Sequence, residues 1–262
     1  TAFGSLVHGV LEDVDVTADD LRAELLARAR DQLDRWPVEL DPEEAATALE
    51  AVLATPLGPL ADDLDLRTLL REPQLKELDF ELPLGGGDRP GPRVTRLGEL
   101  AGLLDEHLPA DDPIRPFAER LRSPALAAQS LRGYLSGSID LALRLPDGRC
   151  LVVDHKTNWL GPRDVPLTIA GYHPAALADA MNSGTYPLQA LLYSVVLHRF
   201  LRWRLPGYRP ETHLGGVLYL YVRGMAGPEA PRAGGVPFGV FSWHPPAALV
   251  VALSDLLDGG QR

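Results

Sequence analysis

The chain has 262 residues, 25 basic and 36 acidic side chains, and a formal net charge of −11. Apolar residues make up 45% of it, and no apolar run reaches the ~20 residues of a membrane span, so we expect a folded domain outside the membrane. The single cysteine, Cys150, excludes an internal disulfide and a four-thiolate iron–sulfur cluster, and it favours a reducing, cytoplasmic setting. Because phosphate contacts need basic side chains, the acidic balance argues against a free DNA-binding domain.

The first half of the chain has mainly helical patterns. Apolar spacing and helix-start signals predict helices over residues 6–16, 18–36 and 42–53. An extended segment at residues 74–84 leads into the Gly/Pro-rich stretch 85–92, which predicts a flexible loop. The segments 97–108 and 113–121 are compatible with helices or with irregular structure. The first residue is not Met and a signal-peptide layout is missing, so we expect a fragment or a processed chain.

The second half alternates strands and helices. Predicted strands lie at residues 138–145, 150–156, 216–222 and 236–243, and predicted helices at 186–204 and 245–257. Helices around a small mixed sheet predict an α/β (α+β) fold. We expect one domain over residues 1–262.

The turn Pro146-Asp147-Gly148 fixes a hairpin register. This sequence suits a three-residue loop with Gly in the left-handed region. Leu145 then faces Arg149, and counting back places Asp140 opposite Asp154. Lys156 lies two residues further on and shares that face.

Two opposed carboxylates destabilise a sheet unless something neutralises them, and a hard cation such as Mg²⁺ is the simplest explanation. A nearby ammonium can orient a water or stabilise charge on phosphorus. The alternative is a surface salt bridge between Lys156 and either Asp140 or Asp154. Two of the 25 basic residues are lysines and the rest are arginines. A lysine at position 156 therefore favours a functional role, because arginine is the usual basic residue of this chain.

These motifs together resemble the PD-(D/E)XK nucleases, and more narrowly the RecB family of helicase-associated nuclease domains. The stretches that carry the resemblance are G-S-L-V-H at 4–8, E-L-D-F at 77–80, G-S-I-D-L at 137–141, V-V-D-H-K-T-N-W-L-G at 152–161 and Q-x-x-x-Y at 189–193. The likeness extends over residues 4–224. It implies a restriction-endonuclease-like core and the C-terminal part of a larger helicase–nuclease subunit.

The resemblance also implies a role for each matched residue. His8, Asp140 and Asp154 would be side-chain ligands of Mg²⁺, which Mn²⁺ can replace, and the backbone carbonyl of His155 a further ligand. Lys156 would be the catalytic lysine, acting with Asp140 and Asp154. Three further residues would contact DNA or support the site, namely Glu77, Gln189 and Tyr193. Taken alone, Tyr193 fits a core position equally well, and Gln189 a solvent-facing one.

The resemblance implies a DNA nuclease acting on a strand that a helicase feeds to it, in end processing for recombination and degradation of linear DNA. RecC-like and RecD-like subunits would be its partners, with RecA as a further candidate. Tethering to a helicase would answer the charge objection, because effective concentration replaces intrinsic affinity. The alternative is a catalytically silent nuclease-fold module that binds protein or DNA. One cysteine argues against the AddAB type with its iron–sulfur cluster, and no phosphate-binding G-x-x-x-x-G-K-[ST] loop is present.

Overall fold

The computed structural model describes residues 1–85, 87–88 and 94–258 and is built around a five-stranded mixed sheet. The strand order is β1 (Gln74–Leu84), β2 (Gly133–Arg144), β3 (Cys150–Lys156), β4 (Leu214–Tyr221) and β7 (Val240–Trp243). β3 and β4 are parallel, and the other neighbouring pairs are antiparallel. This sheet, flanked by helices, confirms the expected α/β class. Of the predicted loop at 85–92, positions 86 and 89–92 lie outside the described residues.

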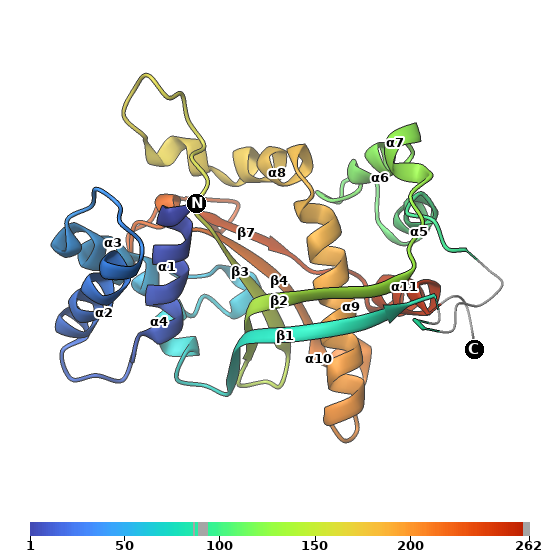
Figure 1. The fold of residues 1–262 in the computed structure, drawn as a ribbon, viewed down its shortest axis with the longest axis horizontal. Coiled ribbons are helices and arrows are strands. Elements are labelled where there is room, and N and C mark those ends of the chain that lie inside the picture. The colour runs from blue at the N-terminus through green and yellow to red at the C-terminus, as the bar shows by residue number, and fades with distance from the viewer. Residues whose placement is uncertain (86, 89–93, 259–262) are drawn as a thin grey trace.

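Helices surround the sheet in separate groups (Figure 1). At one end lie α1 (Ala2–Asp13), α2 (Leu21–Arg35), α3 (Pro42–Ala54) and α4 (Leu66–Leu69). At the other end lie α5 (Glu99–His107), α6 (Phe117–Leu121), α7 (Pro124–Ala127) and α11 (Ala247–Leu257). The long helix α9 (Tyr186–Arg204) crosses the strands. Further elements are α8 (Pro174–Ser183), α10 (Pro210–His213) and a small hairpin of β5 (Arg232–Ala233) and β6 (Val236–Pro237). Within the described residues, no helix has the length and apolar character needed to cross a bilayer.

The sheet separates two apolar cores. One face contributes Leu141, Leu143, Leu151, Val153 and Leu218 to a core shared with α1, α2, α3 and α4. The opposite face contributes Val152, Val217, Tyr219 and Phe241 to a core shared with α5, α9 and α11. This division follows the two-residue alternation of side chains along a strand. α1 and α9 therefore approach the sheet from opposite sides, and each carries residues predicted for the site.

Local signals explain where the elements begin. Thr1 caps α1 by accepting a hydrogen bond from the Gly4 amide at 3.2 Å, so this helix begins before the predicted position 6. Asp20 caps α2 in the same way through the Ala23 amide. The predicted strand 236–243 is divided into β6 and β7, because Gly239 adopts a φ of +81°.

Candidate active site

The hairpin between β2 and β3 has the predicted register. The pairs run from Arg144 opposite Cys150 to Leu141 opposite Val153, and the Leu145 amide donates to the Arg149 carbonyl at 2.7 Å. Gly148 has a φ of +94°, as the three-residue loop requires. The last pair of this ladder, Leu141–Val153, is adjacent in sequence to Asp140 on β2 and to Asp154 on β3.

Beyond this last pair the Asp140 carboxylate interacts with the backbone of β3. Its Oδ2 accepts a hydrogen bond from the His155 amide at 2.8 Å. Burial favours the neutral form of Asp140, but the hydrogen bond and charge of His155, together with the charge of His8, hold the pKa of this carboxyl below its ordinary value. Among the described residues, the ion pairs of Asp140 are with His8 and His155, and none joins it to Lys156.

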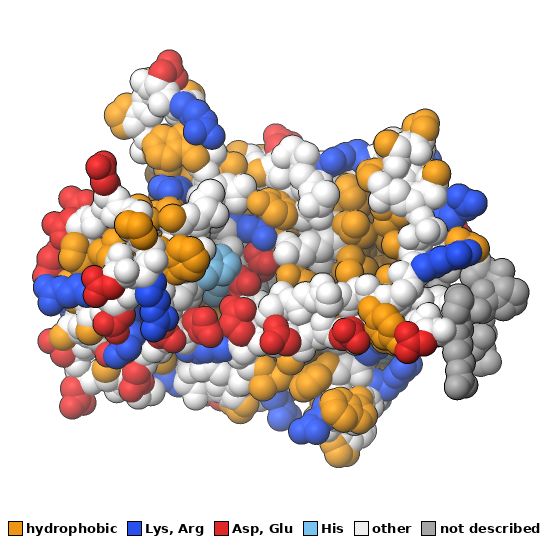
Figure 2. Space-filling model, in the orientation of Figure 1, with side chains coloured by type: hydrophobic (Ala, Val, Ile, Leu, Met, Phe, Trp, Pro, Cys, Tyr) orange, Lys and Arg blue, Asp and Glu red, His pale blue; other side chains and the backbone are white. Residues whose placement is uncertain are grey.

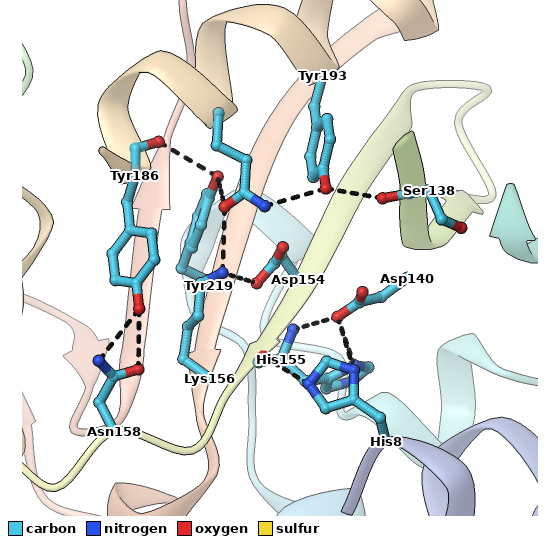
Figure 3. A network of polar contacts seen from close by, with 11 residues as sticks. His8, Ser138, Asp140, Asp154, His155, Lys156, Asn158, Tyr186, Tyr193 and Tyr219 are labelled. Atoms are coloured by element: carbon cyan, nitrogen blue, oxygen red, sulfur yellow. Dashed lines mark hydrogen bonds and ion pairs between the residues drawn. The ribbon is translucent and has the colours of Figure 1, made fainter. Parts of the chain in front are cut away.

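His8 joins α1 to this part of the sheet. Its Nδ1 lies 3.4 Å from Asp140 Oδ2, and its Nε2 lies 3.0 Å from the His155 carbonyl oxygen (Figure 3). Both ring nitrogens therefore face groups that the sequence analysis named as metal ligands. The His8 and His155 rings also meet edge to face, with centroids 5.8 Å apart.

Glu77 on β1 completes an acidic group. One ligand atom each from His8, Glu77 and Asp140 lies within 4.8 Å of the others. Burial raises the pKa of Glu77, and the hydrogen bond from Ser138 Oγ at 3.1 Å opposes the shift. Glu77 also has a φ of +44°, a left-handed conformation that is uncommon for a residue other than glycine.

This donor set fits a hard divalent cation. Carboxylate and carbonyl oxygens are the ligands that Mg²⁺ prefers, and imidazole nitrogen also binds divalent metals. The group offers two carboxylates and an imidazole, with the His155 carbonyl adjacent to the imidazole. Asp154 does not belong to this group of three, although the charge of Asp140 contributes to raising the pKa of Asp154.

Asp154 instead pairs with Lys156. Its Oδ2 lies 2.5 Å from Lys156 Nζ, and its side chain is 3% exposed. Burial raises the pKa of Asp154, and the Lys156 ammonium opposes this shift. The predicted catalytic lysine and one predicted ligand are thus direct neighbours on the α9 side of the sheet.

Gln189 and Tyr193 on α9 extend this pair into a chain of hydrogen bonds. Lys156 Nζ donates to Gln189 Oε1 at 3.1 Å, and Gln189 Nε2 donates to the Tyr193 hydroxyl at 3.0 Å. Tyr193 then donates to the Ser138 carbonyl on β2 at 2.7 Å. Burial raises the pKa of Tyr193 to about 12, so its hydroxyl keeps its proton near neutral pH. Gln189 is therefore a half-buried, hydrogen-bonded residue and not a solvent-facing one.

Two tyrosines that the sequence analysis gave no role enclose the lysine. Lys156 Nζ lies 4.3 Å from the ring centroid of Tyr186 and 5.0 Å from that of Tyr219. Tyr219 also donates its hydroxyl proton to Gln189 Oε1 at 3.1 Å, and it pairs in register with Asp154. The spacing of Tyr186 three residues before Gln189 on one helix was the available signal.

Comparison with known proteins gives the family. The family model described as "PD-(D/E)XK nuclease superfamily" matches residues 1–235. The chain belongs to the PD-(D/E)XK nuclease superfamily. Asp140 and the Asp154-His155-Lys156 triplet stand where the superfamily name places its acidic residues and lysine, and the fold agrees with the sheet and helices expected of it. Ile139 replaces the proline of that name and is fully buried in the core.

Relatives of this PD-(D/E)XK chain carry the name "RecBCD enzyme subunit RecB". The protein of Mycolicibacterium smegmatis is 56% identical over 257 residues, and that of Mycobacterium tuberculosis strain H37Rv is 55% identical over 266 residues. These matches cover 98% and 99% of this chain but 24% of each relative. The Escherichia coli protein is 31% identical over 98% of this chain and 19% of its own length. The chain therefore spans about a quarter or less of the relatives that it matches.

Proposed function

We propose that this chain is a Mg²⁺-dependent deoxyribonuclease domain of a RecB-type helicase–nuclease. The observation that carries the proposal is the proximity of two arrangements, the His8–Glu77–Asp140 group and the Lys156–Asp154 pair, around the end of the β2–β3 ladder. Carboxylates suited to a cation, next to an ammonium, match the needs of phosphodiester hydrolysis. In that reaction a water oxygen bonds to phosphorus while one phosphorus–oxygen ester bond breaks.

Different residues of the chain would bind the cation and stabilise the reacting phosphate. His8, Asp140, Asp154 and the His155 carbonyl would hold the cation, with Glu77 beside them. When bound, the cation would lower the pKa of a water and neutralise phosphate charge. Lys156, held by Gln189 and flanked by two tyrosine rings, would face the attacked phosphate and stabilise the charge that develops on its oxygens.

Binding a cation at Asp154 would require this carboxylate to exchange its ion pair with Lys156 for the metal. The Lys156→Met variant should therefore bind Mn²⁺ several-fold more tightly than the parent chain, while its cleavage of DNA should be lost. Asp140→Asn and Asp154→Asn should weaken Mn²⁺ binding at least tenfold. Calorimetric titration with Mn²⁺ measures the affinities, and cleavage of linear DNA with Mg²⁺ measures activity.

Asp79→Asn is the matched control, because Asp79 is an exposed carboxylate on β1 two residues from Glu77. It should leave both Mn²⁺ affinity and cleavage unchanged. An Mn²⁺ affinity that depends on Glu77 but not on Asp154 would restrict the site to the three-residue group. If the parent chain does not bind Mn²⁺ and does not cleave DNA with Mg²⁺, a catalytically silent module that binds protein or DNA explains the chain better.

We also propose the setting implied by the relatives' name, a complex with RecC-like and RecD-like subunits in the cytoplasm that processes DNA ends during recombination. The net charge of −11 supports it, because approach to DNA would be weak without a helicase that delivers the strand. No observation supports RecA as a partner. Reconstitution with those subunits should raise the cleavage rate of linear DNA, and an equal rate for the chain alone would contradict the tethering argument.

A further inference from the structure

A large open cavity lies against the proposed metal group. It has a volume of about 650 Å³, and His8, Glu77 and Asp140 form part of its lining. Arg35 and Trp36, at the end of α2, line the same cavity. Figure 2 shows pale-blue histidine and red carboxylates between the helical group that includes α1 and α2 and the sheet. The volume lies within the range of small-ligand sites.

Trp36 presents an aromatic surface to this cavity. It is the C-cap of α2, its amide donates to the Gln32 carbonyl at 2.8 Å, and its side chain remains 41% exposed. The backbone is thus fixed by the helix end while the indole is accessible. An exposed aromatic ring beside a phosphodiesterase site is suited to stacking on an unpaired nucleobase.

Arg35 supplies positive charge to a cavity that is otherwise acidic. The other titratable side chains that line it are Glu12, Asp13, Glu77, Asp140 and His8. Among the described residues, no carboxylate lies within ion-pair distance of the Arg35 guanidinium. Its donors are therefore available for a phosphate oxygen.

Three small residues of α1 also line the cavity. They are Gly4, Ser5 and Gly9, and they add little side-chain bulk beside the longer side chains that α1 contributes. A Cβ at Gly9 would lie 2.5 Å from the Gln32 side chain of α2, so the glycine lets the two helices pack closely here. The close contact of α1 with α2 brings the end of α2 to the proposed metal group.

We infer that Arg35 and Trp36 bind one nucleotide of single-stranded DNA next to the scissile phosphate, with the indole stacked on the base and the guanidinium on a phosphate. This inference rests on the proposed nuclease function. A paired base already stacks on its neighbours, so the same contact would require local unstacking of a duplex. The pair would therefore make the site prefer a single strand.

Binding of a short oligothymidine to the full chain, in Ca²⁺ in place of Mg²⁺ to limit cleavage, tests the inference. Trp36→Ala should weaken binding about tenfold, since base–aromatic stacking has that magnitude, and Trp36→Phe should restore most of the affinity. Arg35→Ala should weaken binding and reduce its salt dependence by about one phosphate contact. The matched control is Trp203→Ala, which removes an indole that is 76% exposed on α9 and should leave binding unchanged.

Oligonucleotides with one base removed in turn locate the contact. In the parent chain, removing the base at one position should lower the binding affinity as much as Trp36→Ala does. In the Trp36→Ala variant, removing the same base should cause no further loss of affinity, as expected in a double-mutant cycle for two groups that contact each other. Equal binding by Trp36→Ala and Trp203→Ala would overturn the inference even if the parent chain cleaves DNA. If instead the parent never cleaves but the Trp36 effect is present, the nuclease proposal fails and the nucleotide site stands.

Discussion

Glu77 and Asp140 face one another across β1 and β2, in the position between the pairs Lys76–Leu141 and Leu78–Ile139. On the other side of β2 the ladder with β3 ends at Leu141–Val153, and Asp154 of β3 pairs with Tyr219 on β4. Three neighbouring strands, β1, β2 and β3, thus each carry an acidic residue in this part of the sheet. Like charges on neighbouring strands are unfavourable in a sheet, so the close approach of Glu77 and Asp140 fits the proposed cation site better than a stabilising role.

The left-handed backbone of Glu77 predicts an unusual response to glycine. Its φ of +44° is costly for glutamate by about 1 kcal/mol, and glycine avoids this cost. We expect Glu77→Gly to keep or slightly raise the free energy of unfolding without metal, whereas Glu81→Gly on the same strand should lower it by about 1 kcal/mol. Urea denaturation of both variants measures this, and an equal loss would remove the strain argument.

The buried ion pair of Lys156 and Asp154 predicts a stability effect. The crowding of two carboxylates alone would lead us to expect Asp154 substitutions to hold or raise stability. The structure predicts the opposite effect, because substituting either residue alone leaves the other as a buried charge without its counter-ion. Lys156→Met should lower the free energy of unfolding by about 3 kcal/mol in metal-free buffer, and the double variant with Asp154→Asn by clearly less. Additive losses in the double-mutant cycle would show that the two side chains are not coupled.

His198 on α9 predicts a pH dependence separate from the site. Burial, together with the charges of Arg202 and Arg199, lowers the pKa of His198 to about 4 from an ordinary value near 6.5, against the opposing charge of Asp255. The unfolded chain therefore binds a proton at a higher pH than the folded chain. The contribution of His198 to the free energy of unfolding is therefore fully present above about pH 6.5. It should fall by about 3 kcal/mol as the pH approaches 4.

The variant His198→Gln isolates this contribution, because the amide does not titrate and can still bond to the Tyr208 hydroxyl, which lies 2.8 Å from His198 Nδ1. The difference in unfolding free energy between the parent and this variant should change across the window from pH 6.5 to pH 4. Thermal or urea unfolding at several pH values measures it. A constant difference over that range would show that His198 titrates normally.

Lys76 is the other lysine of the chain, and it connects β1 to α1. Its Nζ donates to the Glu12 carbonyl near the end of α1 at 2.5 Å, and it lines a small cavity with His8 and Glu77. Lys76→Met should lower stability by about 1 kcal/mol and weaken Mn²⁺ binding several-fold, because it frees the helix that carries His8. Lys76→Arg should restore part of both, and unchanged Mn²⁺ affinity in Lys76→Met would show that His8 is positioned without this contact.

The sequence by itself determined the hairpin and the helix that support the site. Pro146-Asp147-Gly148 specified the register of β2 with β3, and the apolar pattern specified α9 and its Gln189–Tyr193 spacing. These features depend on local turn chemistry and on periodicity, which residues close in the chain decide. The motif order identified the family, although the roles of individual residues stay predictions.

Only the tertiary structure decided where the carboxylates point. The β2–β3 ladder ends at Leu141–Val153, so Asp140 bonds to the His155 amide while Asp154 turns to Lys156. Which partner each receives depends on α1 packing on one face of the sheet and α9 on the other, and no short-range pattern encodes that. The same holds for Arg35 and Trp36, because the contact between α1 and α2 brings them to a cavity shared with residues 77 and 140.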